Sequence, residues 1–214
     1  GCGSHWPTCN GEIVPHPKSF KTLVEVTHRI TSGIDLLLVV ALAVCSFRWL
    51  PKGHPGRVAG ALSLFFMLTE AAVGAGIVLL EYVAQNASIA RALWMGAHLT
   101  NTFLLLGALG ASVTLARADL VPPGRRRAAD VLLLVVAGSL LVVGVSGAVA
   151  ALGDTLFPAA TLGAGFAADA SPTAHILLRL RVLHPVLALA GAGLALTGAA
   201  RAHDAAVSRE SKQA

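Results

Sequence analysis

Charged residues are scarce in this sequence. Only 13% of its 214 residues are Asp, Glu, Lys or Arg, whereas 55% are hydrophobic. Soluble domains carry about 25% charged residues, so the composition excludes an ordinary soluble domain. The hydrophobic residues gather into runs of about twenty, which are long enough to cross a bilayer core of about 30 Å. We therefore predict an all-α, polytopic transmembrane helix bundle.

Lys and Arg are absent from two of the loops between these runs. The runs predict five membrane spans, at 24–50, 57–82, 91–116, 128–152 and 176–200. Loops 83–90 and 153–174 contain no Lys or Arg, whereas the loop between the third and fourth spans contains four arginines. By the positive-inside rule, the basic loops face the cytoplasm and the N-terminal segment lies outside. The basic loops also explain the net charge of +5, so we expect no nucleic-acid partner.

The sequence also lacks an initiator Met and a signal peptide. It begins Gly-Cys-Gly and ends in a polar tail, and we expect a fragment cut at both ends. The Pro-Pro-Gly sequence at 122–124 predicts a boundary between two halves. In each half an aromatic-Pro pair precedes a histidine that opens a helix, His28 in the first and His184 in the second. This similarity between the two halves favours an internal repeat, which is common in membrane folds.

Three of the eight histidines lie inside the predicted spans, namely His28, His98 and His184. Their spans run in the same direction, and at a rise of 1.5 Å per residue all three lie within roughly 10–15 Å of the outer surface. A bis-histidine haem needs one imidazole on each side of a flat macrocycle. We predict that His28 and His98 ligate one haem iron, and that His184 ligates another with a histidine outside this chain. The alternative is that each histidine only hydrogen-bonds across helices.

Glu25 lies three residues before His28, so the two side chains share one face of a helix. A polar group in a lipid-spanning helix is costly unless it serves a site. We interpret Glu25 as an acid, a base or a cation-stabilising group at the haem edge. The alternative is a carboxylate that interacts with the dipole at the start of a helix.

Other polar residues in the spans allow two interpretations. Asp35 and Glu70 lie deeper than Glu25, and we expect Glu70 to face the bundle interior. Asn101 follows His98 by three residues and is placed to orient it. Whether these acids act in chemistry or only pair with neighbours stays open. The arginines near the outer ends of the spans, such as Arg29 and Arg181, either bind haem propionates or snorkel to the interface.

Cys2 and Cys9 lie in the predicted outer segment, where an oxidising compartment permits a disulfide. So small a loop gains only modest stability from closure, which favours a redox role. Metal binding with His5 or His16 is the alternative, although the spacing suits zinc poorly. Cys45 is interpreted as a small apolar filler.

Several of these stretches together resemble the haem A synthase family, membrane enzymes of cytochrome oxidase assembly. The matching stretches are at 3–11, 25–29, 97–103, 150–158 and 180–185. The resemblance covers most of the chain. It implies an eight-helix protein of two pseudo-repeated four-helix halves, of which this chain would contain helices two to six.

The resemblance also implies an arrangement of sites. Residues 1–120 would form the first helical half, with the outer Cys loop and the substrate haem site. Residues 121–214 would begin the second half, with an incomplete haem cofactor site. The substrate haem O would lie between His28 and His98, and His184 would be an axial ligand of a haem b cofactor. The family's essential carboxylate matches Glu25, and its outer-loop disulfide matches Cys2 and Cys9.

The reaction that the resemblance implies is oxidation of a haem O methyl group to a formyl group, which gives haem A. This is an oxidoreductase reaction that uses O2 and electrons, in the membrane of a bacterial cell. Expected partners are haem O, membrane lipid, a thiol–disulfide or quinone electron donor, and a second copy of the chain or haem O synthase. One alternative is a non-enzymatic bis-histidine cytochrome b that carries electrons. Another is a small transporter whose polar path contains Asp35, Glu70 and Asn101.

Overall fold

The structure is a computed structural model that describes residues 1–13, 16, 19–83, 86–116 and 127–210. Apart from turns and one isolated bridge between Cys9 and Glu12, the secondary structure of these residues is helical. Five of the helical segments are long and apolar enough to cross a membrane. The prediction of an all-α, multi-pass membrane protein with five spans is therefore confirmed. The Pro-Pro-Gly boundary and the arginines that follow it at 125 and 126 lie outside the described residues.

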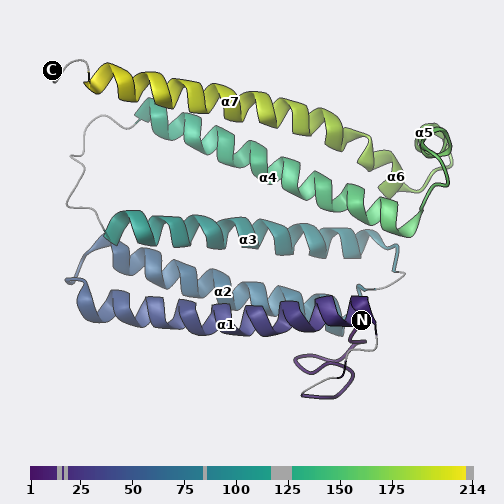
Figure 1. Ribbon diagram of the computed structural model, residues 1–214, viewed down its shortest axis with the longest axis horizontal. Helices are drawn as coiled ribbons and strands as arrows, with labels where there is room; N and C mark the ends of the chain where they lie inside the picture. Colours follow the sequence, from purple (N-terminus) through teal and green to yellow (C-terminus); the bar gives the residue numbers. More distant parts are fainter. Residues whose placement is uncertain (14–15, 17–18, 84–85, 117–126, 211–214) are drawn as a thin grey trace. The chain divides into compact units, whose positions relative to one another are not determined.

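The chain divides into two compact units, residues 1–121 and residues 122–214. Each unit is described by itself. The first contains three long helices, α1 (Phe20–Trp49), α2 (Pro55–Leu79) and α3 (Ile89–Ala116). Helix α2 packs against both α1 and α3 (Figure 1).

Local sequence explains where the helices of the first unit begin and how closely they pack. The Ser19 side chain accepts a hydrogen bond from the backbone N–H of Thr22 and caps α1, as serine does at many helix starts. Pro55 opens α2, where its missing N–H has no cost. A Cβ on Gly76 would lie 2.5 Å from the Trp94 ring, so glycine is required where α2 meets α3. Apolar contacts between the three helices centre on Val39, Met67 and Leu105.

The second unit contains two long helices and two short ones. They are α4 (Arg127–Leu156), α5 (Leu162–Ala170), α6 (Ile176–Arg181) and α7 (Leu183–Glu210). Helix α4 packs against α6 and α7, and α5 lies against α6 (Figure 1).

Two details of the second unit differ from the sequence prediction. The predicted loop 153–174 contains a helix, α5, whose first turn is capped by the Thr161 side chain. The predicted fifth span is interrupted at Val182, between α6 and α7. Pro185 explains the interruption, because it has no N–H to donate to the carbonyl of Arg181 four residues earlier. The proposed repeat of two four-helix halves stays a prediction.

Candidate functional site

The first polar site lies between α2 and α3, around His98 and Glu70. The Nδ1 atom of His98 is 3.2 Å from Oε1 of Glu70. Neighbouring groups cover most of both side chains, since the Glu70 side chain is 16% exposed and the His98 side chain is 29% exposed. A carboxylate oxygen accepts hydrogen bonds, so the tautomer with its proton on Nδ1 is the one that suits this contact with Oε1. The lone pair is then on Nε2, the nitrogen that could ligate a metal.

Neutral donors hold the Glu70 carboxylate in place. Asn101 Nδ2 donates to Oε2 of Glu70 at 2.6 Å, and the Thr102 hydroxyl donates to Oε1. The Asn101 amide is itself fixed, because it also donates to the Phe66 carbonyl at 2.8 Å and accepts from the Thr69 hydroxyl at 2.7 Å. Asn101 therefore contacts Glu70 and not the His98 ring, so any effect it has on His98 passes through Glu70.

The second polar site lies between α4 and α7, around His184. Its Nδ1 atom is 3.0 Å from the hydroxyl oxygen of Ser146. The Ser146 hydroxyl donates its one proton to the Val143 carbonyl at 2.9 Å. With its proton there, the hydroxyl accepts from His184, and this tautomer has the imidazole proton on Nδ1 and the lone pair on Nε2.

A glycine lies under each imidazole ring. A Cβ on Gly74 of α2 would lie 3.5 Å from Cε1 of His98, and a Cβ on Gly147 of α4 would lie 3.0 Å from Cε1 of His184. No hydrogen bond of Nε2 is found for either histidine within the part of the chain that the structure describes. The Nδ1 atom of His184 is therefore hydrogen-bonded to the neighbouring helix, whereas the Nδ1 atom of His98 only lies close to a carboxylate oxygen of its neighbour. In both rings the Nε2 atom is available to a ligand.

The predicted pair of His28 and His98 is not in direct contact. His28 is exposed on α1, and no hydrogen bond or ring contact joins any two of His28, His98 and His184 among the described residues. These residues also contain no group of three or more His, Cys, Asp or Glu side chains that could hold a metal ion by themselves. Ligation of one iron by His28 and His98 stays a prediction. Asp35 is likewise exposed on α1.

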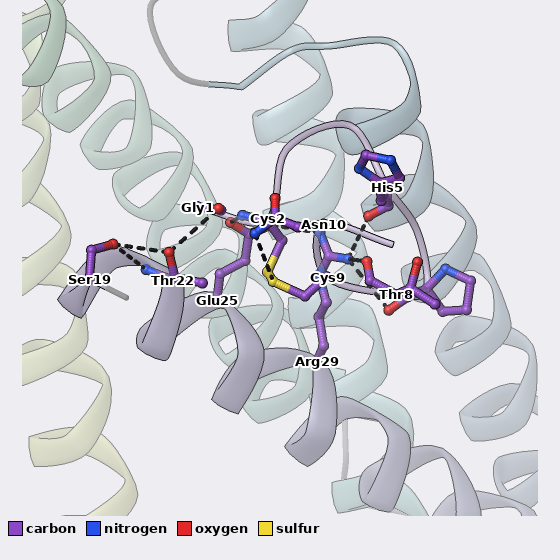
Figure 2. Close-up of a disulfide and its surroundings, with 11 residues drawn as sticks. Gly1, Cys2, His5, Thr8, Cys9, Asn10, Ser19, Thr22, Glu25 and Arg29 are labelled. Carbon is purple, nitrogen blue, oxygen red and sulfur yellow. Dashed lines mark hydrogen bonds and ion pairs between the residues drawn. A yellow bond between two sulfur atoms is a disulfide. The ribbon is translucent and has the colours of Figure 1, made fainter. Parts of the chain in front are cut away.

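Glu25 and Arg29 hold the N-terminal segment (Figure 2). Cys2 and Cys9 form a disulfide and are almost completely buried, at 0% and 3% exposed. Oε2 of Glu25 accepts from the Cys2 backbone N–H at 2.8 Å, and Oε1 pairs with the Arg29 guanidinium at 2.6 Å.

The other guanidinium nitrogen of Arg29 donates at 2.6 Å to the carbonyls of His5 and Thr8. The Glu25 carboxylate and the Arg29 guanidinium thus clamp the disulfide loop onto the start of α1. Their described partners are protein groups, so this clamp is the role that the geometry gives them.

Arg181 has the corresponding role in the second unit. Its Nε atom is 2.6 Å from Oδ1 of Asp169 on α5, and its Nη1 atom is 2.6 Å from Oδ1 of Asp154 at the end of α4. Its Nη2 atom donates to the Gly165 carbonyl at 3.3 Å. Arg181 thereby ties α4, α5 and α6 together, and these protein groups occupy its guanidinium.

Sequence reasoning missed Ser146 and the two aspartates. Ser146 lies in the glycine-rich stretch 144–147, whose small residues are typical of close packing between helices. A hydroxyl among small residues at a helix contact is also typical of a hydrogen bond between helices, and that signal was available. Asp154 and Asp169 are far apart in a segment predicted to be a loop, so their shared partner could not be predicted.

Five apolar spans define a multi-pass membrane protein, and its half-buried His98 and His184 have Nε2 atoms that no described residue engages. Over 192 residues, 88% of its length, the chain is 46% identical to a protein of Thermus thermophilus named protoheme IX farnesyltransferase, of which the match covers 31%. Proteins named heme A synthase are 38% identical over 79 residues in Exiguobacterium sp. and over 78 residues in Bacillus mycoides.

These two matches cover 37% and 36% of this chain and 26% and 25% of the heme A synthases. The chain thus spans about a third or less of the length of each of these curated relatives. No family model matches the chain. No solved structure matches it either.

The prediction of a haem A synthase is wrong. The relative that matches 88% of the chain is named as a farnesyltransferase, whereas the heme A synthase matches cover little more than a third of it. The predictions that the chain oxidises a haem O methyl group and that it is an oxidoreductase depended on this resemblance, and they are wrong as well. The non-enzymatic cytochrome b stays an alternative interpretation. Histidines and carboxylates in membrane helices predict contact with a haem, but they do not specify what is done to the porphyrin.

Proposed function

We propose that this chain is a haem-binding membrane portion of a protein of the protohaem IX farnesyltransferase type. Such a protein is a transferase that makes haem O, in the biosynthesis of haem A for cytochrome oxidase. The observation that carries the proposal is 46% identity over 88% of the chain to the Thermus thermophilus protein of that name. Because the chain spans about a third of that relative, the activity of the whole protein is part of the proposal.

The two histidine sites support the choice of a porphyrin as ligand. Haem iron takes neutral imidazole nitrogens as axial ligands, and His98 and His184 each have an Nε2 lone pair. The absence of a Cβ at Gly74 and at Gly147 leaves each imidazole close to the backbone of its neighbouring helix. In this proposal His98 binds the porphyrin substrate, with His28 as its second ligand, and His184 binds a haem b.

The role of the chain in the reaction is to bind and orient the porphyrin. Transfer of a farnesyl group requires the acceptor to be held still against the donor, and positioning of this kind is a large part of catalysis. An imidazole fixed at Nδ1 by a neighbouring helix fixes the direction of its Nε2, and hence the orientation of the macrocycle that it ligates.

The proposal also gives the chain a location. We place it in the membrane of a bacterial cell with the disulfide loop on the outer side. The support is that loops 83–90 and 153–174, which would share that side, contain no Lys or Arg.

The test is extraction of haems from membranes that contain the full-length protein. Separation by chromatography and mass spectrometry is expected to reveal haem O, which a control without the gene should lack. In the purified protein, His98→Ala and His184→Ala should each remove one bound haem. His16→Ala, which changes an exposed histidine, should remove none. Membranes that contain the protein but no haem O, or full haem content in both variants, would contradict the proposal.

A further inference from the structure

Glu70 is a carboxylate in the middle of an apolar helix, and it needs an explanation. It lies within the membrane-spanning segment Pro55–Leu79 and is only 16% exposed. An ionisable side chain at such a position is costly, and proteins keep one there mainly for function. Asn101 and Thr102 offset part of this cost by donating to the carboxylate.

The arrangement around Glu70 brings one oxygen to the imidazole of His98. Asn101 occupies Oε2, and Oε1 is shared between the Thr102 hydroxyl and the Nδ1 atom of His98. That Nδ1 atom is buried and makes no hydrogen bond to any described residue, Glu70 included. Nδ1 lies 3.2 Å from Oε1, a distance at which a well-aligned N–H donates to a carboxylate.

We propose that Glu70 is a positioning residue, which holds the Nδ1–H of His98 and directs Nε2 toward the iron of a bound porphyrin. The inference rests on the proposed function for the identity of the ligand. A carboxylate that accepts from Nδ1 makes the imidazole a stronger electron donor. A stronger donor stabilises ferric iron, so the haem at His98 should have a lower midpoint potential than it would with a neutral partner for Nδ1.

The second unit supplies the internal comparison. Its histidine has the Ser146 hydroxyl, a neutral partner, in the place of the carboxylate. If both histidines bind haem, the two irons should differ in potential, and the haem at His98 should have the lower value.

The experiment uses the purified full-length protein in two backgrounds. In His184→Ala, any remaining haem belongs to His98, and Glu70→Gln is added to it. The glutamine is similar in size and still offers a carbonyl oxygen to Nδ1, but it has no charge. We expect haem content to stay near that of the parent, the midpoint potential to rise, and the low-spin electron paramagnetic resonance spectrum to shift. In His98→Ala, the same Glu70→Gln substitution should leave the potential of the His184 haem unchanged.

The outcomes separate the two proposals. An unchanged potential and spectrum after Glu70→Gln, with haem still bound, would overturn the positioning role and leave the histidine site intact. Glu70→Ala gives a second check, because the loss of any acceptor for Nδ1 should lower haem affinity at His98 by roughly 10–100-fold. If His184→Ala and His98→Ala together still bind haem at full content, the proposed function fails instead, whatever Glu70 does.

Discussion

His98 in the first unit and His184 in the second are held in similar ways but by different partners. Each lies on a long helix, packs over a glycine of the neighbouring helix and has its Nδ1 atom engaged by a side chain of that helix. In the first unit the partner is the Glu70 carboxylate, and in the second it is the Ser146 hydroxyl. The comparison teaches that an imidazole packed over a glycine can face partners of different chemistry, a carboxylate in one unit and a hydroxyl in the other.

The two units also differ in how they hold the segment that precedes His28 or His184. The residue three positions before His28 is Glu25, and the residue three positions before His184 is Arg181. Each binds the segment that precedes its helix. The first unit adds a covalent bond, the disulfide between Cys2 and Cys9, whereas the second depends on ion pairs. Removal of a charge should therefore disrupt this segment more in the second unit than in the first.

The largest effect is expected from Asp169→Asn. Asp169 is 13% exposed and pairs with Arg181, itself 11% exposed, so removal of the charge should lower the stability of the second unit by about 1.5–3 kcal/mol. Asp154 is 68% exposed, and Asp154→Asn should cost only about 0.2–1 kcal/mol. Thermal unfolding in detergent and limited proteolysis around α5 measure the difference. Equal effects of the two variants would show that burial of the pair is unimportant.

Ser146→Ala tests whether the second histidine depends on its neutral partner. The variant removes the acceptor for the Nδ1–H of His184, so haem affinity at this site should fall by roughly 10–100-fold. Haem titration of the purified protein in the His98→Ala background measures this. Ser139→Ala is a matched control, because this hydroxyl on the same helix donates only to the Val136 carbonyl. Similar losses in both variants would assign the effect to α4 itself.

The spans and the histidines could be predicted from the sequence because hydrophobic runs of sufficient length have few alternatives to a membrane helix. The five spans agree with the structure to within a few residues at most of their ends. Helix α5 was missed because nine residues rich in Ala and Gly have no strong pattern, and its Thr161 cap looks like any loop threonine. The break at Val182 was missed although Pro185 indicates it, since the apolar run continues through the proline.

The histidine sites were only half predictable. Their polar residues stand out in apolar helices, so Glu70 and Asn101 were found, whereas Ser146 was overlooked because a serine costs little in such a helix. Which side chains pair depends on helix rotation, and the sequence does not give that rotation. The reaction could not be predicted for a different reason. The histidines indicate a candidate haem site, but they do not indicate which reaction the porphyrin undergoes.

The smallest effect, and the finest test of the comparison, is expected from the two glycines under the rings. A Cβ on Gly147 would lie 3.0 Å from Cε1 of His184, so Gly147→Ala must displace the ring by a few tenths of an ångström. Such overpacking costs about 1 kcal/mol, which is close to a fivefold loss of haem affinity at His184. At Gly74 the corresponding distance is 3.5 Å, an ordinary contact, and Gly74→Ala should leave haem affinity at His98 unchanged. The Gly74 variant should also be slightly more stable, because alanine is the better helix former. A loss of haem from the Gly74 variant alone would mean that the His98 ring moves toward α2 when it binds.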